Sequence, residues 1–193
     1  MKLVVITPER PVHNEAKLIS SMLDCGVARV NLRHPGIDPM ALRNILDGIP
    51  RRNMARVSLH DCHELAREYG TGIHLNSRNP VAPENFSGSL SISCHSIEEA
   101  TRVAGKHYYF ISPVFPSISK PGYQPVIALD DYREAFRNGY LDRRAVALGG
   151  VAPQNIHILN EIGFSAVAML GYVWNGSSER DIINKISILC SNL

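Results

Sequence analysis

Two serines and a lysine follow an apolar run near the middle of the chain. The run at 108–113 leads into Ser117, Ser119 and Lys120, whose hydroxyl and ammonium groups can bind and neutralise an anion. In α/β barrels, ligands are held by the loops that leave the C-terminal ends of the strands. The sequence therefore predicts an anion site in the loop after this run.

Two glycine-containing loops contribute a second part of the same site. Gly149-Gly150 and Leu170-Gly171 follow the last two apolar runs of the chain. Barrels often bind phosphate with the loops after their seventh and eighth strands, because glycine lets backbone N–H groups approach the oxygens closely. We expect these loops to hold a phosphate, with Lys120 and its two serines completing the site. The alternative is that Gly149-Gly150 only turns the chain into the next helix.

A cluster of His60, Asp61, Cys62 and His63 lies at the end of the third apolar run. Structural zinc needs four convergent ligands, usually in two spaced pairs, and we expect His63 to point off the start of a helix. Asp61 alone suits Mg²⁺, which needs only one or two carboxylates together with substrate phosphate. The alternative is that Asp61 caps the helix that begins at Cys62.

Asn31 and Arg33 lie on one face of the second apolar run. In a closed barrel this face points into the lumen, where Arg33 needs an acidic or phosphate partner. If the face points outward, Arg33 is an ordinary surface charge. His74 and His95 lie within expected strands and are interpreted as hydrogen-bonded core histidines. No Gly-x-Ser-x-Gly segment is present, so hydrolysis by a serine triad is unsupported.

The elements that must position these residues are short apolar runs, most of them separated by helix-compatible polar segments. Continuous apolar strands suit a parallel sheet that is buried on both faces, and strand–helix alternation implies right-handed crossovers. We therefore expect one α/β domain over 1–193, a minimal single (β/α)8 TIM barrel, with an open doubly wound sheet as the alternative. The expected strands are Leu3–Thr7, Val27–Arg33, Arg56–His60, Gly72–Asn76, Ser89–His95, Tyr108–Pro113, Arg144–Gly149 and Ala166–Gly171.

Helices are expected between most of these runs, and some carry their own signals. Ser96 and Glu99 form a capping-box pattern, and Pro153 suits a first helical turn. The segment 78–88 contains two prolines and has little room for a helix. The expected helices are Glu15–Cys25, Pro39–Leu46, His63–Tyr69, Ile97–Ala104, Asp130–Asn138, Pro153–Ile162 and Ser178–Leu189.

Composition excludes several classes of partner. The net charge is +2, with 20 Lys and Arg against 18 Asp and Glu, and no basic run with interleaved aromatic residues is present, so we expect no nucleic-acid partner. The first seven residues are too short an apolar run for a signal peptide or a membrane span. The four cysteines include no C-x-x-C pair. These features predict a soluble cytoplasmic protein without a membrane partner; whether it is a monomer or a homo-oligomer is left open.

Several segments, taken together and in order, resemble the thiamine phosphate synthase family, including its thiazole tautomerase (TenI-like) branch. The combination is specific although no single segment is, and it spans nearly the whole chain. The resemblance implies a (β/α)8 barrel that uses Mg²⁺ to join an aminomethylpyrimidine diphosphate to a thiazole phosphate, releasing pyrophosphate and forming thiamine phosphate. The segments are Asn31-Leu32-Arg33, His60-Asp61 with 64–66, 72–75, 93–100, 113–120, 146–150 with Asn155, and 163–171.

The resemblance also implies roles for individual residues. Arg33 and Lys120 are then the catalytic contacts to pyrophosphate, and Asp61 and Asn79 occupy the metal positions. Bond cleavage leaves a pyrimidine carbocation that the thiazole nitrogen captures, so a protein nucleophile is unnecessary, and positioning with charge neutralisation carries the catalysis. The implied substrate-binding residues are Asn31, His60, Ser93, Ser117, Ser119, Gly149, Gly150, Leu170 and Gly171.

Some positions depart from the family pattern. Pro35 stands where the family has a phosphate-binding lysine, Asn79 where it has its second magnesium aspartate, and His60 where it has an asparagine. Each lost contact to an ionised group is worth about 1.5–3 kcal/mol, so we expect Mg²⁺ binding to be weak or lost and synthase activity to be weak or absent. Pro35→Lys and Asn79→Asp together should raise activity more than either alone.

Two alternatives to a synthase follow from the same departures. The tautomerase branch carries a histidine at the position of Pro113. A non-catalytic binder of thiazole phosphate or thiamine phosphate is the third reading, because the serine–lysine loop and the glycine pair are intact. Robust wild-type turnover would point to His34, His60 or Arg78 as replacement phosphate or metal contacts.

Overall fold

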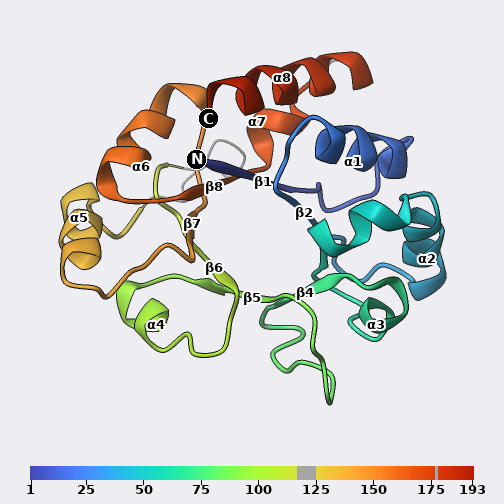
Figure 1. Cartoon of the computed structure of the whole chain (residues 1–193), viewed down its shortest axis with the longest axis horizontal. Helices are drawn as coiled ribbons and strands as arrows, with labels where there is room; N and C mark the ends of the chain where they lie inside the picture. The colour runs from blue at the N-terminus through green and yellow to red at the C-terminus, as the bar shows by residue number, and fades with distance from the viewer. Residues whose placement is uncertain (117–124, 177) are drawn as a thin grey trace.

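Eight parallel strands close into a barrel in this computed structural model, which describes residues 1–116, 125–176 and 178–193. Each strand pairs with the next in chain order, and β8 pairs back onto β1 through Lys2 opposite Ala166 and Val5 opposite Met169. The expectation of a single (β/α)8 TIM barrel is confirmed (Figure 1). The strands are β1 (Lys2–Ile6), β2 (Arg29–Leu32), β3 (Val57–Leu59), β4 (Gly72–Leu75), β5 (Leu90–Cys94), β6 (Tyr108–Ile111), β7 (Ala145–Ala147) and β8 (Ala166–Met169).

Helices surround the barrel in Figure 1, except at the long loop between β4 and β5. Residues 76–89 contain no helix, as the two prolines predict. The segment expected as one helix over Pro153–Ile162 is divided into a 3₁₀ turn and an α-helix, and the turns at η1 and α7 were not expected. The helices are α1 (Glu15–Asp24), α2 (Pro39–Asp47), η1 (Arg51–Arg56), α3 (Leu65–Tyr69), α4 (Ile97–Thr101), α5 (Leu129–Arg137), η2 (Pro153–Asn155), α6 (Ile156–Ile162), α7 (Gly171–Trp174) and α8 (Glu179–Asn192).

The capping box expected at Ser96 is present. Ser96 Oγ accepts a hydrogen bond from Glu99 N at 3.0 Å, and the Glu99 carboxylate accepts one from His95 N at 2.7 Å. Asp38 caps α2 by accepting from Met40 N and Ala41 N, with proline at the first helical position. These caps satisfy N–H groups at helix starts and fix where the chain leaves each strand.

The barrel interior is apolar on one side and polar on the other. Six buried apolar residues from β1, β6, β7 and β8 fill one side: Val4, Ile6, Phe110, Val146, Ala166 and Ala168. The strands β2 to β5 instead direct polar side chains inward, including the fully buried Asn31, Ser58 and Ser91. Barrel interiors are usually packed with branched apolar residues, so this polar half is unusual and is the candidate binding region.

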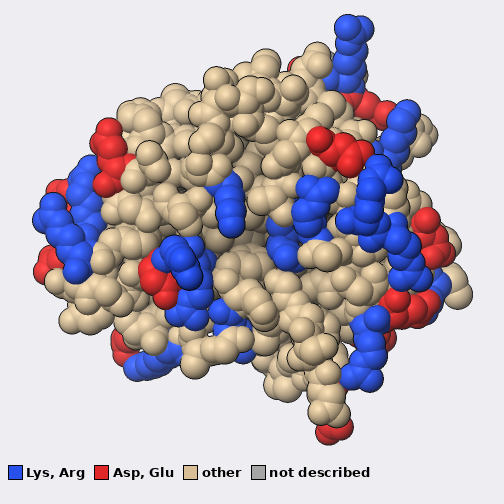
Figure 2. All heavy atoms as spheres, in the orientation of Figure 1, with Lys and Arg blue, Asp and Glu red and all other residues tan. Residues whose placement is uncertain are grey.

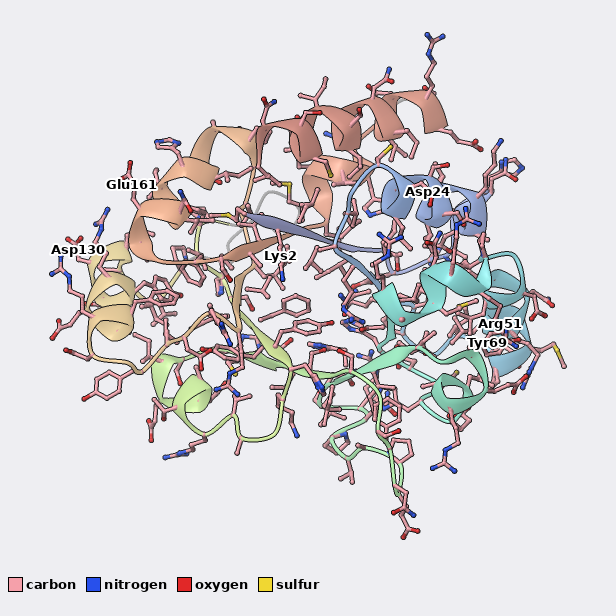
Figure 3. The ribbon with its side chains drawn as sticks, in the orientation of Figure 1. Lys2, Asp24, Arg51, Tyr69, Asp130 and Glu161 are labelled. Carbon is pink, nitrogen blue, oxygen red and sulfur yellow. The ribbon has the colours of Figure 1, made fainter. Side chains whose placement is uncertain are left out.

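Acidic side chains lie mostly over the outer ring of helices in Figure 2, whereas Lys and Arg side chains also surround the centre of the face, where Lys2 lies in Figure 3. Asp24 at the end of α1, Asp130 on α5 and Glu161 on α6 lie at the periphery in Figure 3. Figure 2 shows basic and acidic side chains intermixed on this face, in agreement with the near-neutral net charge. No helix among the described residues is long and apolar enough to cross a membrane.

Candidate functional site

A cavity of about 900 Å³ opens where the strands end. Its lining comes from residues at or just beyond the C-terminal ends of all eight strands, from Ile6 on β1 to Leu170 after β8. This is the end of a barrel at which substrates bind. Two arginines, Arg33 and Arg78, line one part of the cavity, and the two glycine loops line another.

The glycine loops lie together on the cavity wall, where the sequence places a phosphate site. Gly149, Gly150, Leu170 and Gly171 all line the cavity. Gly149 and Gly150 have φ of +96° and +62°, a backbone region that favours glycine. The loop is held by its neighbours, since Phe115 N donates to Gly149 O and the Asn155 side-chain amide donates to Gly150 O. Phosphate binding at this loop stays a prediction.

The other half of the predicted anion site cannot be placed. Ser117, Ser119 and Lys120 lie outside the described residues. Pro113, at the position where the tautomerase branch carries a histidine, lines the cavity beside Ser112.

Aromatic rings form one surface of the cavity. The rings of His60 and His74 are stacked with centroids 4.1 Å apart, and Phe110 packs against His74 at 5.0 Å. All three residues line the cavity. These rings pack on one another and are 5% exposed or less, so they form a tightly packed aromatic floor beneath the cavity.

Each of the two stacked histidines has hydrogen-bonding partners inside the barrel. His74 Nδ1 lies 2.9 Å from Ser91 Oγ, and His74 Nε2 lies 2.9 Å from Ser93 Oγ. His60 Nε2 is 3.2 Å from Asn31 Oδ1, and this amide oxygen can only accept, so His60 carries its proton on Nε2. His74 is therefore the hydrogen-bonded core histidine that the sequence predicts. Ser93 lines the cavity as well as contacting His74, whereas Asn31 reaches the site through His60.

Burial controls the charge of this pair. Desolvation by burial, together with nearby His63, lowers the pKa of His74 from 6.5 to about 3. The pKa of His60 is well below its usual value, mainly because of burial and then because of His74. Both imidazoles are therefore neutral near pH 7 and act as hydrogen-bonding aromatic surfaces rather than cations.

His74→Gln should remove part of the pH dependence of stability. A histidine whose folded pKa lies below its unfolded pKa stabilises the fold above about pH 6.5, and this stability is lost as the pH falls toward the folded pKa. Through His74 alone, acidification from about pH 7 to pH 5 should cost about 2 kcal/mol of unfolding free energy. Urea unfolding at both pH values should show a smaller loss in His74→Gln than in wild type. The exposed His157→Gln is the control, and an equal loss in all three proteins would refute the assignment.

His95 and His63 do not lie where the sequence predicts. His95 follows the end of β5 and is exposed on the cavity wall, so its interpretation as a core histidine is wrong. Its Nδ1 lies 3.1 Å from Ser112 O. His63 is buried, 7% exposed, rather than pointing off a helix, because α3 begins only at Leu65.

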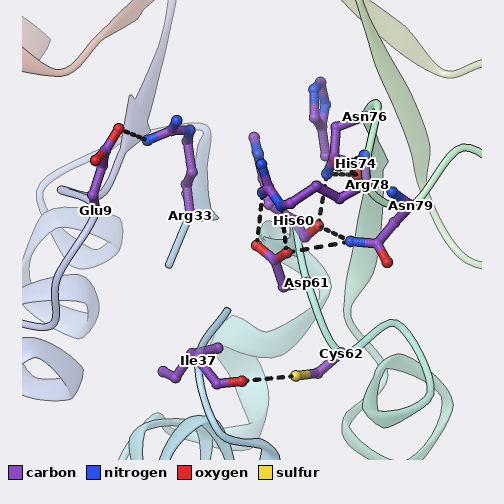
Figure 4. A network of polar contacts seen from close by, with 10 residues as sticks. All are labelled: Glu9, Arg33, Ile37, His60, Asp61, Cys62, His74, Asn76, Arg78 and Asn79. Carbon is purple, nitrogen blue, oxygen red and sulfur yellow. Dashed lines mark hydrogen bonds and ion pairs between the residues drawn. The ribbon is translucent and has the colours of Figure 1, made fainter. Parts of the chain in front are cut away.

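Asp61 is paired with an arginine. Arg78 donates from Nε to Asp61 Oδ1 and from Nη2 to Oδ2, both at 3.1 Å (Figure 4). The Asn79 side-chain amide donates to Asp61 Oδ1 at 3.2 Å and to His60 O at 3.0 Å. The alternative that Asp61 caps the following helix is wrong, since α3 starts after Glu64 and has no side-chain cap.

A tight turn after β4 presents Arg78. Asn76 Oδ1 accepts from Arg78 N at 2.9 Å and Asn79 N at 3.1 Å, and its amide group donates to His60 O at 2.7 Å. Asn76 and Asn79 also exchange backbone hydrogen bonds of 3.1–3.2 Å. Asparagine stabilises turns by this side-chain-to-backbone pattern. The position of Arg78 is thus set by the turn as well as by Asp61.

The residues at the predicted metal positions do not fit Mg²⁺. Magnesium requires oxygen ligands, yet both oxygens of Asp61 face N–H donors of Arg78, and Asn79 directs its amide nitrogen toward Asp61. Within the described parts of the chain, no group of three or more His, Cys, Asp or Glu side chains could hold a metal ion. A guanidinium therefore occupies the place of the cation in this arrangement.

Asn79→Asp alone should destabilise the protein instead of helping it. The side-chain NH₂ group of Asn79 donates to both Asp61 Oδ1 and His60 O. In Asn79→Asp an oxygen takes its place, so the new carboxylate faces two acceptors and donates to neither. Leaving these partly buried acceptors without a donor costs about 1–3 kcal/mol. Thermal and urea unfolding should show this loss, with the exposed Asn85→Asp of the same loop as the control. Unchanged stability of Asn79→Asp would refute the donor role of Asn79.

Arg33 has an acidic partner, as an interior arginine requires. Its Nη1 lies 3.0 Å from Glu9 Oε1, and both residues line the cavity. The Arg33 side chain is one-quarter exposed and its backbone N–H donates to Thr7 Oγ1 at 2.9 Å. Asn31, two residues earlier, is fully buried inside the barrel. The two residues thus lie at different depths, with Arg33 at the mouth.

Pro35 lies in a turn that leaves the barrel mouth. Ile37 N donates to His34 O at 3.0 Å, and Gly36 has φ of +74°, which is the pattern of a type II turn with proline at its second position. His34 is buried against Glu15 of α1, with 3.1 Å between Nε2 and Oε2. His34 therefore anchors this loop to α1 and does not line the cavity as a replacement phosphate contact.

Comparison with known proteins shows to which family this chain belongs. The model of the family described as thiamine monophosphate synthase matches residues 3–173. This chain belongs to that family. Thiamine monophosphate synthases act in thiamine biosynthesis, and the matched range includes every strand of the barrel and both arginines of the cavity.

Individual members of the thiamine monophosphate synthase family show the extent of similarity. Thiamine-phosphate synthase of Lactococcus lactis subsp. lactis is 23% identical over 194 residues, covering 93% of this chain and 89% of that protein. The enzyme of Nitrosococcus oceani is 34% identical over 147 residues, covering 71% and 64%. The crystal structure of thiamine phosphate pyrophosphorylase from Bacteroides thetaiotaomicron superposes with a TM-score of 0.90 at 30% identity, covering 100% and 98%.

Two cavity residues were not assigned a role from the sequence. Glu9 precedes α1 in an ordinary polar loop, and nothing in its spacing indicates the contact to Arg33. Arg78 was considered only as a replacement contact if turnover proved robust. The sequence feature that could have indicated Arg78 is the pair of asparagines at positions 76 and 79. Closely spaced asparagines predict a turn, and a residue within a turn is exposed.

Proposed function

We propose that this chain condenses an aminomethylpyrimidine diphosphate with a thiazole phosphate to form thiamine phosphate and pyrophosphate. The observation that carries the proposal is one cavity with three complementary parts. Its glycine loops suit a phosphate, its arginines suit a diphosphate, and aromatic rings lie in the same cavity. The volume of about 900 Å³ is large enough for two small ring systems at once.

The bond changes in this reaction require no protein nucleophile. The C–O bond between the pyrimidine methylene carbon and the diphosphate breaks, and its electron pair leaves with the diphosphate. The lone pair of the thiazole nitrogen then forms the new C–N bond to that carbon. No proton is lost because this nitrogen carries none, and the product thiazolium keeps the positive charge. The protein must hold the rings in contact and stabilise the leaving group.

The cavity residues correspond to these two tasks. Arg33 and Arg78 would contact the diphosphate as its negative charge increases, since charge-assisted hydrogen bonds are the stronger kind. His60 and His74 would lie beneath the rings of the two substrates. Because both imidazoles are neutral, they would not repel the positive charge that develops on the pyrimidine. Backbone N–H groups of the Gly149-Gly150 and Leu170-Gly171 loops would hold the thiazole phosphate at the opposite end.

His95 favours a thiazole tautomerase as the second candidate. It is exposed on the cavity wall beside Pro113, and its Nδ1 faces the carbonyl oxygen of Ser112. A neutral imidazole that donates from Nδ1 keeps a basic Nε2, which could move a proton on a thiazole. A tautomerase would therefore use His95 in place of the histidine that the branch carries at position 113.

One set of incubations separates the candidate functions. The wild-type protein is mixed with both condensation substrates, and separately with the thiazole carboxylate tautomer alone, and products are followed by chromatography. Thiamine phosphate in the first incubation supports the synthase. Conversion in the second without product in the first supports the tautomerase. If neither forms while calorimetry shows thiazole-phosphate binding, the protein is a binder and the proposal fails.

A further inference from the structure

Arg78, and not a carboxylate, faces the cavity at the positions where the family binds its metal. Arg78 lines the cavity and its side chain is 43% exposed, whereas the Asp61 side chain is 11% exposed. In Figure 4 the guanidinium lies over the carboxylate with both contacts drawn. A ligand that enters the cavity therefore encounters a cation that belongs to the chain.

The geometry of Arg78 leaves donors for a ligand. A guanidinium has five N–H groups in a planar fork, and the contacts to Asp61 use one on Nε and one on Nη2. Three N–H groups remain beyond this ion pair. Arginine forks match phosphate oxygens in bidentate fashion, so Arg78 can bind Asp61 with one edge and a phosphate with another.

Arg78 is also positioned before a ligand arrives. The turn from Asn76 to Asn79 is closed by backbone bonds at both ends, and Asn76 Oδ1 accepts from Arg78 N. Asn79 and Asn76 both donate to His60 O, which ties the turn to the end of β3. A side chain that is already held in place loses less conformational entropy on binding than a lysine side chain on a flexible loop.

The same contacts exclude the metal arrangement. A magnesium ion needs near-octahedral oxygen ligands, and the Asp61 oxygens are engaged by the guanidinium at 3.1 Å. The orientation of Asn79 is fixed by two acceptors, Asp61 Oδ1 and His60 O, so its nitrogen rather than its oxygen faces the site.

We propose that Arg78 is the cation that binds the diphosphate of the pyrimidine substrate, and that this chain binds diphosphate without a divalent metal. The inference rests on the proposed function, because that function supplies the diphosphate as ligand. In place of the weakened Mg²⁺ site expected from the sequence, the diphosphate is bound by a guanidinium, and Asp61 positions that guanidinium.

Calorimetry with inorganic pyrophosphate tests this directly. Wild-type protein is titrated in a buffer containing EDTA and in one containing Mg²⁺. Binding should occur in EDTA with an affinity within about threefold of the Mg²⁺ value. Arg78→Gln should weaken binding in EDTA by at least about tenfold, the equivalent of one charge-assisted hydrogen bond. Added Mg²⁺ should not restore it.

Arg144→Gln is the matched control. Arg144 contacts both oxygens of Asp142, as Arg78 does with Asp61, but the pair precedes β7 at the opposite end of the barrel. Its removal should leave pyrophosphate affinity unchanged. Thermal melts of both variants show whether each is folded at the temperature of the titration, and the two wild-type titrations test metal dependence without any variant.

Specific outcomes overturn the inference. Wild-type binding that occurs only with Mg²⁺, or binding in EDTA that is equal in Arg78→Gln and wild type, contradicts it. If thiamine phosphate still forms in Mg²⁺, the proposed function stands while the inference fails. If pyrophosphate binds in EDTA through Arg78 but no thiamine phosphate forms under any condition, the proposed function fails and metal-free diphosphate binding stands.

Discussion

Gly150→Ala is expected to abolish thiazole-phosphate binding and to lower the free energy of unfolding by about 2–5 kcal/mol, combining the left-handed backbone penalty with overpacking. A Cβ at this position would lie 2.3 Å from Pro116 O and 2.7 Å from Phe115 Cβ. The first contact is with backbone, which cannot rotate away as a flexible side chain can. The loop must therefore shift away from the neighbouring strand end, and the predicted phosphate site shifts with it.

Gly139→Ala is the control that separates backbone conformation from contact. Gly139 has φ of +73°, close to the +62° of Gly150, but an added Cβ would meet nothing within 4 Å. It should therefore cost only about 1–2 kcal/mol and leave ligand affinity unchanged. Urea unfolding and calorimetry with thiazole phosphate measure both effects. Equal unfolding free energies in the two variants, with normal binding in Gly150→Ala, would show that the close approach at Gly150 has no role.

Arg33→Gln should lower kcat/KM for the condensation by about 10–150-fold, which corresponds to the loss of 1.5–3 kcal/mol from one contact to an ionised group. Arg33 lines the cavity, and its partner Glu9 is mostly exposed, with a side chain 61% accessible. Exposed ion pairs contribute about 0–1 kcal/mol to stability. The melting temperature should therefore remain nearly unchanged while turnover falls.

Arg52→Gln is the comparison for Arg33→Gln. Arg52 pairs with Asp24 at 3.3 Å, and both side chains are at least half exposed. Neither residue lines the cavity described for this chain. Full activity in Arg52→Gln together with a large loss in Arg33→Gln supports the assignment. A loss of activity in Arg33→Gln that follows a loss of folded protein would make Arg33 structural.

The barrel could be predicted because its strands are short, continuous apolar runs, most of them separated by helix-compatible segments. Runs such as the one ending at Ile6 and the one ending at Met169 carry this signal without help from distant residues. The start of α4 was predictable for a similar reason, since the Ser96 cap depends only on a residue three positions away, whereas α3 begins two residues later than expected. Local signals therefore specify both the elements and the end of the barrel at which ligands bind.

The chemistry of the diphosphate region depends on contacts that local patterns do not show. Asp61 and Arg78 are 17 positions apart and meet only because β3 and β4 end side by side. The sequence indicates a carboxylate that is available to a metal, whereas the structure shows one occupied by a guanidinium. From the sequence, Asn79 is interpreted as the loss of the family's second magnesium aspartate. In the structure its amide group donates two hydrogen bonds that an aspartate could not make.

In the proposed function, one cavity binds both substrates and joins them. Phosphorus NMR of the wild-type protein with the pyrimidine diphosphate and the thiazole phosphate follows every phosphorus atom in one spectrum. We expect the diphosphate ester and thiazole phosphate signals to decline together while inorganic pyrophosphate and thiamine phosphate appear in equal amounts. A spectrum that matches a protein-free control, or release of pyrophosphate without thiamine phosphate, would contradict it.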